Sequence, residues 1–223
     1  MLRGEVEKLG FEAAIESLLD ILPLRPAMPR LDDVQAIVLT SRHAAPALAE
    51  RAGLPRIYAV GESTAAAART AGCRDVVTSG GNVRNLSRLL IESCRPCGGT
   101  ILHLSGEVVR RGLKGTLEEH GFDYQRLVVY RAVERERYSV PIEAAWRARA
   151  FGAVLLFSPR TAEILVRLLC QSGLEGDVDS TAAICLSDET AAPCRVLNWR
   201  CVHVATRPDR QALLEALVDS STI

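Results

Sequence analysis

Serine, threonine, glycine and arginine residues cluster directly after the short apolar runs of this sequence. Hydroxyl groups, backbone N–H groups and guanidinium forks are donors that proteins use to bind carboxylates and phosphates. The candidate ligand-binding residues are Thr40, Ser41, Arg42, Gly61, Ser63, Thr64, Gly81, Asn82, Ser105, Gly106 and Arg110 in one half of the chain, and Ser158, Pro159, Arg160, Thr161 and Ser187 in the other. A single serine or threonine at a helix start is ordinarily only a helix cap. The recurrence of such turns favours a site for a ligand with several carboxylates or phosphates.

The segments around these turns have the pattern of an α/β protein. Short runs rich in Val, Ile and Leu alternate with amphipathic stretches, as in parallel strands that helices cover on both faces. We predict strands over 11–15, 35–40, 56–60, 75–77, 100–104, 125–130, 152–157, 181–186 and 201–205, and helices over 43–52, 63–71, 82–94, 108–120, 141–149, 160–172, 188–195 and 208–219. Helix N-termini at the carboxyl ends of parallel strands offer unpaired N–H donors, so we expect the candidate residues to gather there.

An internal repeat predicts two similar domains. The run Ala36–Ser41 matches Ala153–Ser158, and in both a strand leads to a serine at the expected N-cap of a helix. Stretches rich in proline and charge at 22–29 and 134–141 have the composition of crossings between domains. We therefore expect a discontinuous domain A, 1–29 with 134–223, and a continuous domain B, 30–133, which face one another across a binding cleft.

Charge and motif content argue against several functional classes. The 27 basic and 27 acidic residues give a formal net charge of zero, which argues against a nucleic-acid partner. No apolar run approaches the roughly 18 residues of a membrane helix and no export signal is recognisable, so we expect a cytoplasmic protein without a membrane partner. Dinucleotide-fingerprint, P-loop and zinc-protease motifs are absent from the sequence, and we predict no metal site.

Histidine and cysteine residues give no indication of a metal or redox centre. The four histidines, His43, His103, His120 and His203, lie at separate points of the chain, and we expect each to be structural. The seven cysteines are scattered and odd in number, which indicates reduced thiols. Cys94-Arg-Pro-Cys97 has the spacing of metal ligands but lacks a second pair, so we interpret it as two incidental thiols.

The order and spacing of several motifs resemble the uroporphyrinogen-III synthase family over nearly the whole chain. The motifs are Ile37-Val-Leu-Thr-Ser41, Val60-Gly61 with Thr64-Ala65, Leu104-Ser-Gly106 with Arg110, Leu127-Val-Val-Tyr130-Arg131, and Leu155-Leu-Phe-Ser-Pro159 with Thr161-Ala162. The resemblance implies two flavodoxin-like or Rossmann-like α/β domains, with mostly parallel sheets, joined by a two-segment linker.

The resemblance also implies the chemistry. The substrate would be hydroxymethylbilane, a linear tetrapyrrole rich in carboxylates, which the family closes to uroporphyrinogen III with loss of water and inversion of ring D. Tyr130 matches the family tyrosine proposed to assist departure of the hydroxyl group. By the same resemblance Ser41, Thr64, Ser158 and Thr161 are carboxylate hydrogen-bonders, and Arg42, Arg110 and Arg160 are charge partners.

Further expectations concern cofactors and partners. The resemblance implies that the reaction needs neither a metal ion nor an organic cofactor. Hydroxymethylbilane synthase is the expected neighbour in the pathway. We expect a monomer, because a hinged cleft leaves little need for a second subunit.

Two departures from the family pattern leave alternatives open. The chain opens with Leu2–Gly10, which resembles the family's first helix, so we expect the first strand of domain A to be missing. Cys185-Leu-Ser187 stands where some members have Gly-Pro-Thr. An alternative function is therefore a non-catalytic tetrapyrrole- or anion-binding protein of the same fold, impaired by the missing strand. A third interpretation is an unrelated sugar- or anion-binding protein. The export signal that is usual in such proteins is not recognisable in this sequence.

Overall fold

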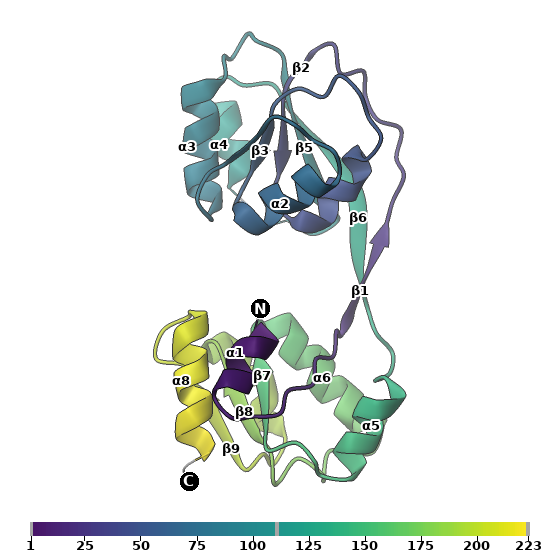
Figure 1. Cartoon of the computed structure of the whole chain (residues 1–223), viewed down its shortest axis with the longest axis vertical. Coiled ribbons are helices and arrows are strands. Elements are labelled where there is room, and N and C mark those ends of the chain that lie inside the picture. Colours follow the sequence, from purple (N-terminus) through teal and green to yellow (C-terminus); the bar gives the residue numbers. More distant parts are fainter. Residues whose placement is uncertain (1, 110–111, 222–223) are drawn as a thin grey trace. The chain divides into compact units, whose positions relative to one another are not determined.

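The computed structural model describes residues 2–109 and 112–221, and it divides into two compact units (Figure 1). Unit 1 comprises the described residues of Met1–Asp20 and Glu134–Ile223, and unit 2 comprises those of Ile21–Val133. The sequence predicts crossings at 29/30 and at 133/134. In the structure the chain passes from one unit to the other within strand β1, Leu19–Pro23, and again at the end of strand β6, Tyr124–Glu134.

Unit 2 contains an open parallel sheet whose strands alternate with helices along the chain. Besides β6, its strands are β2, Val34–Leu39, β3, Ile57–Ala59, β4, Val76–Thr78, and β5, Thr100–Gly106. Its helices are the 3₁₀ helix η1, Arg42–Leu48, and the α-helices α2, Glu62–Thr70, α3, Val83–Ser93, and α4, Leu113–Glu119. The strand order is β1-β6-β5-β2-β3-β4, and the pairs from β6 through β4 are parallel.

Helices cover both faces of this sheet. Alternate residues of β2 point to opposite faces, so this strand contributes to a hydrophobic core on each side. Ile37 and Leu39 pack in a core with residues of η1 and α2, whereas Ala36 and Val38 pack in a core with residues of α3 and α4. All four side chains are fully buried. A strand segment that is buried on both faces is apolar, and this is why Ala36–Leu39 forms one continuous apolar run in the sequence.

Unit 1 contains a second parallel sheet with the order β7-β8-β9. Its strands are β7, Ala153–Leu156, β8, Ala182–Cys185, and β9, Cys201–Val204; its helices are α1, Leu2–Lys8, α5, Val140–Arg147, α6, Pro159–Gln171, α7, Asp188–Ala191, the 3₁₀ helix η2, Ala192–Val196, and α8, Arg210–Ser221. Along β8, Ala183 and Cys185 pack in a core with α6, while Ala182 and Ile184 pack in a core with α1 and α8. The predicted fold class, α/β with mostly parallel sheets, is confirmed.

Three aromatic rings pack together in the core of unit 1. The Trp146 ring lies edge-on to Phe151, with centroids 4.8 Å apart, and edge-on to Trp199, with centroids 6.2 Å apart. Both indoles are buried, and the N–H of Trp199 donates to the carbonyl of Cys194 at 2.9 Å. Edge-to-face pairs of this kind contribute about 0.5–1.5 kcal/mol beyond the area that they bury. Trp146 and Trp199 are the two tryptophans of the chain, and both belong to unit 1.

The prediction of a strand over 11–15 is wrong. Residues 11–17 have no regular secondary structure, and the Ile15 side chain is 68% exposed. Glu16 anchors the segment instead, because its carboxylate accepts hydrogen bonds from the Arg135 guanidinium at 3.2 Å and from the N–H and hydroxyl of Ser139 at 3.0 and 2.8 Å. The strand forms at β1, where β6 is its neighbour in the sheet.

Three predicted helices are shorter or interrupted because of particular residues. In place of the helix predicted over 43–52 there is a 3₁₀ helix, Arg42–Leu48, that contains Pro46, which lacks the N–H needed for α-helical bonding. Helix α4 begins at Leu113, after Gly112 in a positive-φ conformation, and not at 108. The stretch 188–195 divides into α7 and η2, with Pro193 at the start of η2. In the part of the chain that the structure describes, no helix is both long and apolar enough to cross a membrane.

Candidate functional site

The strand order of unit 2 indicates where a ligand is expected to bind. In open parallel sheets, binding crevices form outside the carboxyl ends of the strands, at the point where the strand order reverses. This point lies between β2 and β5, because β3 and β4 follow on one side of β2, while β5 and β6 lie on the other. Thr40 and Ser41 directly follow β2, and Gly106 ends β5. Predicted ligand-binding residues therefore lie at the topological switch point.

A cavity of about 200 Å³ opens at this point, and we call it the switch-point cavity. It is lined by Thr40, Ser41, Val83, His103, Gly106, Val108, Val109, Leu113 and Tyr130. The sequence predicts Thr40, Ser41, Gly106 and Tyr130 as site residues, and the fold brings these four together. The polar groups of this lining are hydroxyls, one imidazole and backbone groups, and none of the described lining residues is charged. Such a lining is suited to an anionic group that neutral donors bind.

Tyr130 reaches the cavity from β6, and Gly106 leaves space for its ring. A Cβ atom on residue 106 would lie 2.6 Å from Cζ of Tyr130 and 2.9 Å from its hydroxyl oxygen, which is closer than real side chains approach. The Tyr130 ring also lies beside the imidazole of His43, with centroids 5.8 Å apart. Among the described residues, the Tyr130 hydroxyl has no hydrogen-bond partner. It is therefore available to a ligand.

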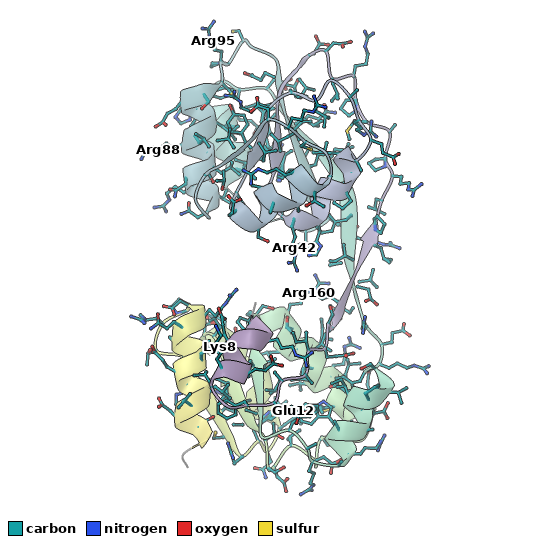
Figure 2. All side chains as sticks on the ribbon, in the orientation of Figure 1. Lys8, Glu12, Arg42, Arg88, Arg95 and Arg160 are labelled. Carbon is teal, nitrogen blue, oxygen red and sulfur yellow. The ribbon has the colours of Figure 1, made fainter. Side chains whose placement is uncertain are left out.

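Ser41 and Arg42 begin helix η1 at the edge of the cavity. Ser41 is the N-cap, and its hydroxyl oxygen accepts from the backbone N–H of His43 at 3.3 Å, which leaves its own proton free to be donated. Arg42 is exposed, and Figure 2 shows its side chain projecting away from the ribbon of unit 2. Burial of the imidazole and, second, the nearby charge of Arg42 lower the pKa of His43. The imidazole beside Tyr130 is thus neutral at neutral pH.

His103 is a lining residue whose functional placement the sequence did not predict. Its imidazole is 3% exposed and bonds at both nitrogens, to the Thr40 hydroxyl from Nε2 at 2.9 Å and to the Tyr124 hydroxyl from Nδ1 at 2.6 Å. Burial, with a smaller effect of the Arg126 charge, lowers the pKa of His103 to about 4. Burial also raises the pKa of Tyr124 to about 12. The signal available in the sequence was a histidine between the apolar residues Leu102 and Leu104 of a strand.

The other predicted residues of unit 2 lie outside the lining. Gly61 caps α2 through its backbone, with Ser63 exposed and Thr64 buried in the first turn. Gly81 has a positive φ, and the Asn82 side chain caps α3 by accepting from the N–H of Asn85 at 2.8 Å. Arg110 lies outside the described residues.

Ser105 is buried and already engaged within the protein. Its hydroxyl donates to the carbonyl of Gly106 at 3.0 Å and accepts from the guanidinium of Arg126 at 2.8 Å. The same guanidinium donates to the carbonyl of Gly106 at 2.7 Å. Ser105 and Arg126 therefore hold the end of β5, and thereby the position of Gly106 under the Tyr130 ring.

Unit 1 presents two matching hydroxyl turns at the carboxyl ends of β7 and β8. Ser158 caps α6 and Ser187 caps α7, each accepting from the N–H three residues later, at 3.2 Å from Thr161 and at 3.4 Å from Thr190. The paired hydroxyls lie 2.7 Å apart in the first turn and 3.2 Å apart in the second. Ser158 caps a helix after strand β7 as Ser41 caps one after β2, which is what the repeat of Ala36–Ser41 and Ala153–Ser158 predicts.

The remaining predicted residues of unit 1 are at the start of α6. Pro159 occupies its first position, where the missing N–H costs nothing. Arg160 forms an ion pair with Glu134 at 3.3 Å, and Arg167 contacts the second oxygen of the same carboxylate at 3.1 Å. Arg160 is therefore engaged, and a ligand would have to compete with Glu134 for it.

The described residues offer no metal or disulfide centre. Within residues 2–109 and 112–221 no group of His, Cys, Asp or Glu is arranged to hold a metal ion. All seven cysteines are free thiols.

Comparison with known proteins identifies relatives of the chain. A family model described as uroporphyrinogen-III synthase HemD matches residues 1–215. No curated protein matches the chain. The crystal structure of uroporphyrinogen-III synthetase from Helicobacter pylori 26695 is similar to the structure with a TM-score of 0.61 at 19% identity, over 91% of this chain and 90% of that one. A mutant uroporphyrinogen III synthase from the extremely thermophilic bacterium Thermus thermophilus gives a TM-score of 0.45 at 16% identity, over 99% and 94%. The first likeness shows a shared fold.

Proposed function

The chain belongs to the uroporphyrinogen-III synthase family, and we propose that its switch-point cavity holds the reacting end of the substrate. As a member it is a hydro-lyase of porphyrin biosynthesis that closes hydroxymethylbilane to uroporphyrinogen III and needs no cofactor. The observation that supports the location is the Tyr130 hydroxyl, which opens into a cavity of neutral donors without a partner among the described residues.

The proposed role of Tyr130 is to assist departure of the substrate hydroxyl. The C–O bond of the hydroxymethyl group on ring A breaks, and the oxygen leaves as water after it receives a proton. Tyr130 donates the hydrogen bond or proton to that oxygen. The azafulvene cation that remains is attacked by the substituted carbon of ring D, and the resulting spiro intermediate fragments and closes again with the ring inverted. Loss of a proton from the closing carbon balances the proton that left with water.

Carboxylates of the substrate are proposed to bind the hydroxyl turns. In unit 2 these are Thr40 and Ser41 at the cavity, with Arg42 beside them and Gly61, Ser63, Thr64, Gly81 and Asn82 at the neighbouring turns. In unit 1 they are the Ser158–Thr161 turn and the Ser187 turn, which expose hydroxyls and helix N–H groups of the kind that bind anions. Hydroxymethylbilane also closes spontaneously without inversion of ring D. These contacts are therefore proposed to hold the substrate in the geometry that leads to inversion.

A coupled assay tests the proposal. Hydroxymethylbilane is generated in situ, the protein is added, and the ratio of uroporphyrinogen III to I is read by chromatography. Excess type III isomer that disappears in a variant with the cavity blocked, Ser41→Trp, supports the proposed site. Ser93→Trp, on the last residue of α3, is the control for adding an indole. Type I isomer alone from the folded wild-type chain would favour a non-catalytic binding protein, and full activity of Ser41→Trp would place the reaction elsewhere.

We also propose that the protein works as a cytoplasmic monomer that takes its substrate from hydroxymethylbilane synthase. The cytoplasmic location is supported by the seven free thiols, since a reducing compartment keeps cysteines in this state. Light scattering coupled to size-exclusion chromatography checks the state of association. A mass of twice the 24.2 kDa chain at assay concentration would contradict it.

A further inference from the structure

His103 connects the half-buried Tyr124 to a hydroxyl that lines the switch-point cavity. It lies in β5 between apolar neighbours, Leu102 and Leu104, which are fully buried. Its Nδ1 atom is 2.6 Å from the Tyr124 hydroxyl, and its Nε2 atom is 2.9 Å from the Thr40 hydroxyl. A buried imidazole is costly unless both nitrogens are bonded. The arrangement is therefore a complete chain from Tyr124 through His103 to Thr40.

The chemistry of the three groups decides the direction of these hydrogen bonds. The depressed pKa of His103 keeps its imidazole neutral, with one N–H and one acceptor nitrogen. The raised pKa of Tyr124 keeps its phenol protonated, and a phenol donates more readily than it accepts. Tyr124 therefore donates to Nδ1, and this assigns the remaining proton of the ring to Nε2. The Nε2–H then donates to the oxygen of Thr40.

The direction of the last bond determines what Thr40 offers to a ligand. A threonine hydroxyl has one proton and two lone pairs. Because one lone pair accepts from His103, the proton is left for a second partner, and Thr40 lines the cavity. In the opposite tautomer Nε2 would carry no proton, and the Thr40 hydroxyl would donate its proton to Nε2. Only the lone pairs of Thr40 would then face an incoming carboxylate, which is itself an acceptor.

We propose that His103 is a positioning residue which, held in one tautomer by Tyr124, aims the Thr40 hydroxyl proton at a substrate carboxylate in the switch-point cavity. The proposal rests on the proposed function of this cavity and adds to it a residue that acts through the Thr40 hydroxyl. It explains why β5 carries an imidazole where an apolar side chain would fill a buried strand position.

Two amide substitutions separate positioning from packing. In His103→Gln the glutamine amide would lie near the place of Nε2 and keep a donor for Thr40. In His103→Asn the shorter asparagine amide would lie near the place of Nδ1 and keep only the bond to Tyr124. We expect His103→Gln to retain KM within about threefold of wild type. We expect His103→Asn to raise KM about tenfold at nearly constant kcat, the effect of losing one hydrogen bond to a charged group. Melting temperatures of the two variants show whether both are folded.

A double-mutant cycle with Thr40 tests whether His103 acts through that hydroxyl. Thr40→Val is expected to raise KM about as much as His103→Asn, and the combination is expected to raise it no further. Additive effects would overturn the proposal, as would a His103→Gln variant as impaired as His103→Asn with an unchanged melting temperature. Tyr124→Phe removes the hydrogen bond to Nδ1 and so no longer fixes the tautomer of His103. This variant is expected to raise KM with kcat unchanged. An unchanged KM would also count against the proposal.

Binding of the product keeps this test separate from that of the proposed function. Uroporphyrinogen III is titrated into wild type, His103→Gln, His103→Asn and Thr40→Val, and its dissociation constant follows the same order as KM. Wild-type protein that binds the product without turning over substrate would overturn the proposed function and leave this order as the test of His103. Wild-type protein that neither binds nor turns over would overturn both.

Discussion

Tyr130 and His103 reach the switch-point cavity from neighbouring strands, yet their hydrogen-bonding states are opposite. The hydroxyl of Tyr130 has no partner among the described residues, whereas both nitrogens of His103 are bonded. A side chain without a hydrogen-bond partner can bind or protonate a ligand. A side chain whose polar atoms are all bonded within the protein can instead hold a neighbouring group in position. Substitutions at the two residues should therefore change different kinetic constants.

Replacing Tyr130 by phenylalanine tests the chemical role. The ring, its packing over Gly106 and its contact with His43 remain, while the proton donor is lost. We expect kcat to fall about 10²-fold, the lower end of general acid catalysis, with KM nearly unchanged. Tyr58→Phe is the matched control, since the Tyr58 hydroxyl contacts Cys94 and does not line the cavity. Wild-type kcat in Tyr130→Phe would remove this tyrosine from the mechanism.

Burial of His103 also makes stability depend on pH. The pKa of His103 is about 4 in the folded chain against an ordinary 6.5, so between these values the unfolded chain binds a proton that the folded chain does not. Stability is therefore complete above pH 6.5 and falls as the pH decreases toward 4. The full loss is about 3 kcal/mol, from about 1.4 kcal/mol per pKa unit.

Urea unfolding of wild type, His103→Gln and His120→Gln between pH 7 and pH 4.5 measures this dependence. The curve for His103→Gln is expected to be flatter than that of wild type. His120 is exposed, and His120→Gln controls for removal of a histidine without burial. Parallel curves for wild type and His103→Gln would show that the imidazole titrates normally.

At the scale of an element, the end of β5 is shaped around the Tyr130 ring. A methyl group at position 106 would lie 2.6 Å from Cζ of Tyr130, so Gly106→Ala must displace the ring or the strand. We expect a loss of kcat like that of Tyr130→Phe, and about 1–3 kcal/mol less stability. Gly115→Ala is the control, because a Cβ at this position in α4 meets nothing within 4 Å. It should raise stability by about 0.5–1 kcal/mol and leave activity unchanged. An active Gly106→Ala enzyme would mean that the ring position is unimportant.

A strand can be predicted from sequence when its own residues determine it, and not when it depends on pairing with a distant segment. β2 and β8 are buried on both faces, so their own apolar runs identify them. The run 11–15 is apolar except for Glu12, yet the strand forms at β1, because pairing with β6 involves residues more than a hundred positions away. Pro46 and Pro193 interrupted predicted helices, and both prolines could have been read as breaks.

The candidate site was predictable in part for the same reason. Thr40 and Ser41 follow β2 and Gly106 ends β5, and position relative to a parallel strand is visible in sequence. His103 was predicted to be structural, and the positioning role proposed for it depends on Thr40 and on Tyr124, which lie on two other segments. Ser105 was predicted to bind ligand but is buried and bonded to Arg126, and burial of this kind arises only when β5 and β6 pair.

At the scale of the whole chain, each described hydrophobic core lies within one unit. Leu168 belongs to a core of unit 1 and Leu90 to a core of unit 2, and both side chains are fully buried. Leu168→Ala and Leu90→Ala are each expected to destabilise their own unit by about 2–5 kcal/mol and to leave the other unchanged. Differential scanning calorimetry reads the two units as separate heat absorptions. A single transition that both substitutions shift equally would show that the units unfold together.

The placement of Trp146 and Trp199 has an optical consequence. Both indoles lie in the core of unit 1, and unit 2 contains none. Selective excitation of indole at the red edge of its absorption band therefore yields emission from unit 1 alone. Unit 2, which contains the switch-point cavity, contributes no indole emission. The native chain thus provides a fluorescence signal specific to one half of the molecule, and a tryptophan introduced into unit 2 would report on the other half.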